Sequence, residues 1–174
     1  GGFDTHSNQE EDFWHSSLLY EMSESIAAFY NDMKQSISLP SGYTNYETGD
    51  IANKVIIVTF SEFGRTIRQN DLNPTKAGTD HASSLPMFIL GGAVQGGQYG
   101  RYPSLEGTVL VDDNDLELIH DFRDVFGTIA TRWLNFPEGQ LLGTGSNVLF
   151  QKTTSADSLG KNYTSFTPIN FLAP

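Results

Sequence analysis

The sequence predicts an α/β fold with a mostly parallel sheet. The first observation is the run Val55–Val58, which is continuously apolar and β-branched, as in strands with both faces covered. The second is segment 8–38, where apolar residues recur every three or four positions, as on one face of a helix. A long amphipathic helix followed by such a strand is half of a βαβ unit. We therefore expect a parallel partner strand just before Gly1, in a longer protein of which this chain is the carboxyl-terminal part.

The composition is that of a folded globular domain. The 174 residues are 38% hydrophobic and 12% aromatic, which is enough to build a core. The net charge of -11 argues against nucleic acid and anionic membrane surfaces as partners, because both reward basic patches. The chain has no cysteine, which excludes disulfides and cysteine-based zinc sites. It contains no transmembrane segment, since no apolar run approaches the roughly 20 residues that span a bilayer.

The helix predicted over residues 8–38 carries one apolar stripe. Its members are Trp14, Leu18, Met22, Ile26, Phe29 and Met33. The acidic residues 10–12 would lie in the first turn, where negative charge favours the amino end of the helix dipole. Pro40, followed by Gly42, ends the helix. We expect the stripe to belong to the core, and His15, which lies off the stripe, to be structural or exposed.

Loops alternate with short elements in the rest of the chain. Segment 66–78 is polar and predicts a surface loop. Residues 85–90 predict a second buried strand, and residues 122–134 predict a helix capped by Asp121. After residue 150 the composition shifts to Thr, Ser, Asn and Lys, so residues 151–174 form either a tail over the body or a lead into further structure.

Five side chains with metal-binding chemistry follow predicted strands or lie in glycine-containing loops. Asp4 and His6 are two residues apart and would point to the same side of an extended segment. Glu62 follows the strand Val55–Val58, at the edge where open α/β sheets bind ligands. Asp80 and His81 are adjacent. Three carboxylates and two imidazoles could hold one or two divalent cations, which in phosphoryl and sulfuryl transfer clamp the reacting oxygens.

Arg65 lies close to the same edge of the predicted sheet. Its planar guanidinium suits the oxygens of an anionic ester, so we expect it to bind substrate or to make a structural contact. The alternative for the whole set is that these residues are helix caps, turn residues and salt-bridge partners.

Five motifs of the sequence resemble a bacterial protein family. They are GGFDTHSNQ at 1–9, TFSEFGR at 59–65, GTDH at 78–81, LGGAVQGG at 90–97 and DFRDVF at 121–126. In order and approximate spacing they resemble domain of unknown function 1501 (DUF1501). The resemblance covers about residues 1–150 and leaves out the carboxyl-terminal tail.

This resemblance implies a fold and a location. DUF1501 is placed in the alkaline phosphatase-like superfamily with the sulfatases, which implies a three-layer α/β/α sandwich with a mostly parallel sheet. Residues 1–150 would be the carboxyl-terminal part of that domain, and residues 151–174 a tail. The nucleophile would lie in an amino-terminal remainder of the same protein. Members are usually exported, often by the twin-arginine (Tat) route, so the resemblance implies a periplasmic, secreted or cell-surface protein.

The superfamily also implies a ligand set. Its early Asp and His are resembled by Asp4 and His6, and its final loop His by His81. Glu62 occupies the position of a later acidic ligand, but Phe63 stands where the superfamily has a His. The set is therefore one imidazole poorer, which favours a single metal, or a harder cation such as calcium, magnesium or manganese, over a two-zinc site.

The expected function is that of a metal-dependent hydrolase of phosphate or sulfate esters, with this chain supplying metal ligands and a small anionic ester as substrate. The alternative is a catalytically degenerate member with a structural or cell-surface binding role. Its motifs would then hold the loops by hydrogen bonds and need no metal.

Overall fold

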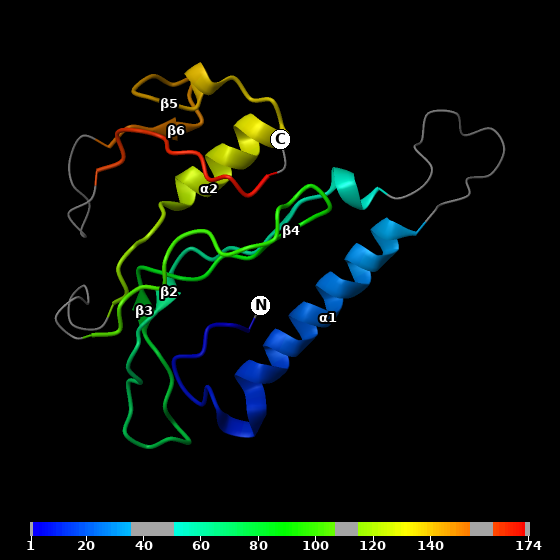
Figure 1. Cartoon of the computed structure of the whole chain (residues 1–174). Helices are drawn as coiled ribbons and strands as arrows, with labels where there is room; N and C mark the ends of the chain where they lie inside the picture. Colours follow the sequence, from blue (N-terminus) through cyan, green and yellow to red (C-terminus); the bar gives the residue numbers. More distant parts are fainter. Residues whose placement is uncertain (1, 36–50, 107–114, 154–161, 173–174) are drawn as a thin grey trace. The chain divides into compact units, whose positions relative to one another are not determined.

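The computed structural model of the chain describes residues 2–35, 51–106, 115–153 and 162–172 (Figure 1). These residues belong to two compact units. The first unit comprises Gly1–Val94 and Leu105–Leu116, and the second comprises Gln95–Ser104 and Glu117–Pro174. All the predicted metal ligands belong to the first unit.

Helix α1 (Trp14–Lys34) is the long helix of the first unit and follows the short 3-10 helix η1 (Glu11–Phe13) (Figure 1). The predicted helix is confirmed in its body but begins later than expected. Asp12 and Phe13 have φ values of 50° and 59°, in the left-handed region, which interrupts the helical path. The acidic residues 10–12 therefore precede α1 instead of forming its first turn. No helix in the described segments is long and apolar enough to cross a membrane.

The apolar stripe of α1 is partly half-buried and partly exposed, so the prediction that it belongs to the core is wrong. None of the described α1 residues is buried, and Trp14 and Phe29 are 52% and 48% exposed. Among the described helices and strands, α1 contacts mainly η1 and the short helix η2 (Ala52–Lys54), which are too small to cover a helix of this length. His15 is itself half-buried, and its Nδ1 is buried without a hydrogen-bond partner among the described residues.

The first unit contains two antiparallel pairs of short strands. Strand β1 (Ile57–Val58) pairs with β4 (Ile89–Leu90), and β2 (Gly64–Arg65) pairs with β3 (His81–Ala82). β1 and β4 lie inside the two predicted strand segments, but neither segment is fully buried. Residues 55–58 are half-buried, and residues 85–90 alternate between half-buried and exposed, as in a strand with one face toward solvent.

The strands of the described residues form separate two-stranded pairs in a small mixed α/β arrangement. The parallel pair is β5 (Leu142–Gly143) with β6 (Phe150–Gln151), in the second unit. The described segments contain no mostly parallel sheet covered by helices on both faces. The three-layer sandwich therefore stays a prediction.

The second unit is built on α2 (Phe122–Thr128), which continues into a π-helix, η3 (Ile129–Trp133), and is followed by a 3-10 helix, η4 (Glu138–Gln140). The side chain of Asp121 accepts a hydrogen bond from the backbone N–H of Arg123 at 2.9 Å, which confirms the predicted cap. The described residues 162–172 pack on α2. Both the Tyr163 hydroxyl and the Thr167 backbone N–H donate to Oδ1 of Asp124, at 2.8 and 2.9 Å. This part of the predicted tail thus belongs to the core of the second unit.

Candidate metal site

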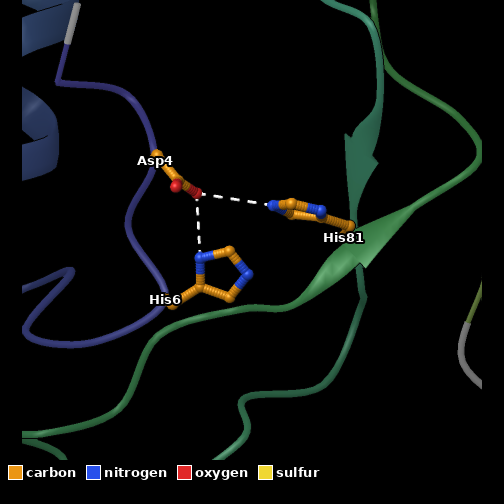
Figure 2. Close-up of side chains that lie close together, drawn as sticks. All are labelled: Asp4, His6 and His81. Atoms are coloured by element: carbon orange, nitrogen blue, oxygen red, sulfur yellow. Dashed lines mark ion pairs between the residues drawn. The ribbon is translucent and has the colours of Figure 1, made fainter.

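Three of the five predicted ligands converge in the first unit. Asp4, His6 and His81 each offer one ligand atom, and these atoms lie within 4.8 Å of one another. Figure 2 shows the Asp4 carboxylate facing both imidazole rings. Its Oδ1 is 2.8 Å from Nδ1 of His6 and 3.5 Å from Nε2 of His81. All three residues are exposed, so small molecules and ions reach the cluster from solvent.

Backbone hydrogen bonds hold the amino-terminal loop against the segment that leads to His81. The N–H of Thr79 donates to the carbonyl of Thr5 at 3.2 Å, and the N–H of Asn8 donates to the carbonyl of Lys76 at 3.2 Å. Thr5 is 3% exposed, so the first of these bonds is shielded from water. The two segments that carry the ligands are therefore joined next to the cluster.

Gly78 makes this close approach possible. A Cβ on Gly78 would lie 2.3 Å from the carbonyl carbon of His6 and from the carbonyl oxygen of Thr5. No side chain fits there unless the two segments separate. Asn70 ties the same junction, because its Nδ2 donates to the His6 carbonyl at 2.8 Å while its Oδ1 accepts from the Gly78 N–H at 3.1 Å.

The other two predicted ligands lie outside the cluster. The Asp80 carboxylate accepts a hydrogen bond from the amide of Asn70 at 2.8 Å. Glu62 is exposed and does not join the cluster found among the described residues. The ligand atoms that the structure brings together are thus two imidazole nitrogens and one carboxylate oxygen.

Arg65 turns its guanidinium toward the cluster. Nη2 donates to Asp4 Oδ1 and, at 3.3 Å, to the carbonyl of Phe3, while Nη1 donates to the carbonyl of Thr79 at 2.7 Å. The hydrogen bond from Arg65 holds the pKa of the Asp4 carboxyl below its ordinary value, and the nearby His6 lowers this pKa further. The carboxylate that would bind a metal is therefore ionised at neutral pH. Sequence reasoning placed Arg65 near the site but did not pair it with Asp4.

Phe63 stacks on His81. The two ring centroids are 3.6 Å apart and the ring planes meet at 20°. The imidazole of His6 lies beside the imidazole of His81, with the two ring centroids 4.5 Å apart. The sequence marked Phe63 only as a position where a ligand is missing, and nothing in the sequence revealed this contact.

A shallow, open hollow of about 460 Å³ adjoins the cluster at His6. It is lined by His6, Ser7, Asn8, Asn70, Asp71 and Lys76. A molecule held in this hollow would lie directly beside one of the candidate ligands.

Two distances in the cluster can be compared with those of a single-cation site. Two ligand atoms bound to a tetrahedral zinc ion at 2.0–2.1 Å lie about 3.3 Å apart. The 3.5 Å between Asp4 and His81 is close to this value, and the 2.8 Å between Asp4 and His6 would open by about half an ångström on binding. Catalytic zinc sites use three protein ligands and an open position, whereas structural sites use four. Among the described residues, the cluster offers three candidate ligands.

One family model, described as "Protein of unknown function (DUF1501)", matches residues 1–144. Since the match spans most of the 174 residues, the chain belongs to this family, as its motifs indicated. The matched range includes Asp4, His6 and His81. No curated protein and no solved structure matches the chain.

Proposed function

We propose that this DUF1501 protein binds one divalent metal ion through Asp4, His6 and His81 and serves as the metal-supplying part of a hydrolase. The observation that carries this proposal is the convergence of the three donor groups within 4.8 Å. Two of them come from the amino-terminal loop and the third from β3. Contacts around Gly78 and Arg65 hold these two segments together.

The donor set favours zinc over the harder cations. Imidazole nitrogens suit zinc and other transition metals, whereas calcium and magnesium prefer oxygen ligands. The absence of a His at position 63 pointed toward either a single metal or a harder cation. Glu62 and Asp80 lie outside the cluster, however, so only one of the three candidate carboxylates is placed to bind a harder cation. We therefore place zinc first.

A small phosphate or sulfate ester is the proposed substrate. This class comes from the resemblance to the alkaline phosphatase-like superfamily, and the open position of the cluster supports it. A metal ion there would polarise a phosphoryl or sulfuryl oxygen. The adjoining hollow is lined by both Lys76 and Asp71, whose opposite charges balance, so its charge does not select the substrate. Arg65 makes the structural contact that was one of its two expected roles, because its donors are engaged by protein oxygens.

The proposal extends to an amino-terminal remainder that completes an alkaline phosphatase-like sandwich in an exported protein. The exposed apolar side of α1 supports this, because Trp14 and Phe29 would be covered by a further layer. Hydrogen exchange of α1, compared between this chain and the longer protein, tests it. Slower exchange in the longer protein is expected, and equal exchange contradicts the proposal.

Metal analysis of the purified protein tests the site. We expect one zinc per chain, and Asp4→Asn and His81→Ala should each weaken zinc binding by at least about tenfold. Asp71→Asn removes an equal charge from the adjoining hollow and serves as the control. Glu62→Gln removes a carboxylate outside the cluster, so it should leave zinc binding unchanged. Zinc-free wild-type protein that takes up no added zinc would sink the proposal.

Hydrolysis tests the reaction separately from the site. Aryl phosphate and aryl sulfate esters should be cleaved by the longer protein in the presence of zinc, and His81→Ala should abolish this activity. Metal binding without activity on either ester class would support the proposed metal site and contradict the proposed substrates.

A structural or cell-surface binding role is the second candidate function. It is favoured by the pairing of Asp4 with Arg65, which neutralises the carboxylate with a protein cation. In that role, the hydrogen bonds of Asn70, Arg65 and Thr79 would hold the loops by themselves. One bound metal per chain contradicts this candidate.

A further inference from the structure

We infer that Phe63 and Arg65 are positioning residues for the metal ligands, with Phe63 orienting the imidazole of His81 and Arg65 orienting the carboxylate of Asp4. This inference rests on the proposed metal site and assigns a task to the two side chains that flank Gly64. It also explains why Phe63, which cannot bind a metal, packs against the candidate ligand His81.

The local backbone puts both side chains on the cluster. Residues two apart on an extended segment point to the same side, and Phe63 and Arg65 are separated by one residue. In the β2–β3 pair, Arg65 lies opposite His81 and Gly64 opposite Ala82. This register brings both side chains to the strand that carries one ligand.

Gly64 lets this segment lie close to the β3 side. A Cβ at Gly64 would lie 1.8 Å from the carbonyl oxygen of Ser84, so any side chain would push the segment away. Gly64 is also buried. The sequence Phe-Gly-Arg thus places a ring and a guanidinium on one side of a strand that packs tightly through its glycine.

The stack restricts the orientation of His81. Rings 3.6 Å apart and 20° from parallel are in contact over their faces, so rotation of the imidazole would drive it into the phenyl ring. In the stacked orientation, Nε2 of His81 points toward Oδ1 of Asp4, 3.5 Å away (Figure 2). A smaller aliphatic side chain at position 63 would leave this ring free to turn.

Arg65 fixes Asp4 from a guanidinium that is itself fixed. The carbonyls of Phe3 and Thr79 accept its hydrogen bonds at 3.3 and 2.7 Å, one from each ligand-bearing segment. Its Nη1 also lies 3.5 Å from Nδ1 of His6. A lysine has no planar fork and could not reach Asp4 and both carbonyls in the same way.

Cobalt(II) titration of the chain, followed by visible absorption, tests the inference, because the bands report both the affinity and the geometry of the ligands. Phe63→Leu should weaken Co(II) binding by at least about tenfold and change the band intensities. Phe63→Tyr keeps the stacked ring, so its Co(II) affinity and band intensities should match those of the wild type. Arg65→Met should weaken binding to a similar extent, and Arg65→Lys should not restore it.

The outcomes separate this inference from the proposed site. If the wild type binds Co(II) and both Phe63→Leu and Arg65→Met bind it with the same affinity and the same absorption bands, the inference is wrong and the proposed site is retained. A wild-type chain that binds no Co(II) overturns both. Far-UV circular dichroism shows whether each variant is folded. If Phe63→Leu is unfolded, Phe63→Ile, which suits an extended segment, takes its place.

Discussion

The substitution Gly78→Ala should separate the two segments that carry the metal ligands. Gly78 lies directly against the backbone of Thr5 and His6, and its φ is outside the left-handed region, so the effect of a methyl group is steric. The neighbouring atoms belong to the backbone and cannot turn aside as a flexible side chain would.

The size of the effect follows from the distances. Carbon atoms in contact lie about 3.5 Å apart, whereas the new Cβ would lie 2.3 Å from the carbonyl carbon of His6. The segments must therefore move apart by about 1 Å, beyond the roughly 0.5 Å within which a site must hold its ligands. Overpacking of this kind costs about 1–3 kcal/mol of unfolding free energy. We expect zinc affinity to fall by at least about tenfold at the same time.

Urea unfolding of the zinc-free protein and competition titration with a zinc-binding dye measure the two effects. Gly96→Ala is the matched control, because no atom lies within 4 Å of a Cβ at that glycine. Gly96→Ala should bind zinc like the wild type. Wild-type stability and affinity in Gly78→Ala would refute the steric reasoning, and a loss of stability without a loss of affinity would show that the junction does not position the ligands.

Further predictions concern the junction and the second unit. Asn70→Ala removes three side-chain hydrogen bonds and should lower the free energy of unfolding by about 1–3 kcal/mol and weaken zinc binding, as measured by the same two assays. Thr128→Val leaves the backbone N–H of Ile169, bonded to the Thr128 hydroxyl at 2.9 Å, without its acceptor and should cost about 1–3 kcal/mol in urea unfolding, whereas Thr128→Ser should cost less. Burial, together with the hydrogen bond to Asp124, raises the pKa of Tyr163, so its contribution to stability is present below the ordinary tyrosine pKa of about 10 and is lost as the pH rises above it. The stability difference between wild type and Tyr163→Phe should therefore shrink above pH 10, and a constant difference would contradict this assignment.

The sequence predicts which chemical groups could form the site better than it predicts which residues come together there. Asp4, His6 and His81 could be named because short motifs place imidazole and carboxylate groups beside glycines and strand ends. Which of the five candidates meet depends on the junction at Gly78 and on the β2–β3 register, and neither can be read from local patterns. Asp80, for example, is adjacent to His81, yet its carboxylate turns to Asn70. Neighbouring residues on an extended segment point to opposite sides, which accounts for the difference.

The same limit applies to the larger elements. Periodicity located α1 and α2 and the segments of β1 and β4, because each has a local signal. It did not locate the start of α1, where Asp12 and Phe13 adopt left-handed conformations without glycine. It also overestimated burial, since an apolar stripe shows what a helix can cover and not whether a partner covers it. The contacts of Phe63 and Arg65 carry no periodic signal and emerge only in three dimensions.

The contacts around the cluster bear on whether a metal would serve folding or chemistry. The positions of the ligands are explained by contacts within the chain, made by Gly78, Asn70 and Arg65. Bound zinc would therefore add its binding free energy to stability without being needed to build the site. In zinc fingers, by contrast, chelation unfolds the chain because the metal supplies the folding free energy. Removal of zinc by a chelator should therefore abolish ester hydrolysis in the proposed longer protein while leaving its far-UV circular dichroism unchanged. Unfolding on chelation would instead assign the metal a structural task and remove the main reason for regarding the cluster as a catalytic site.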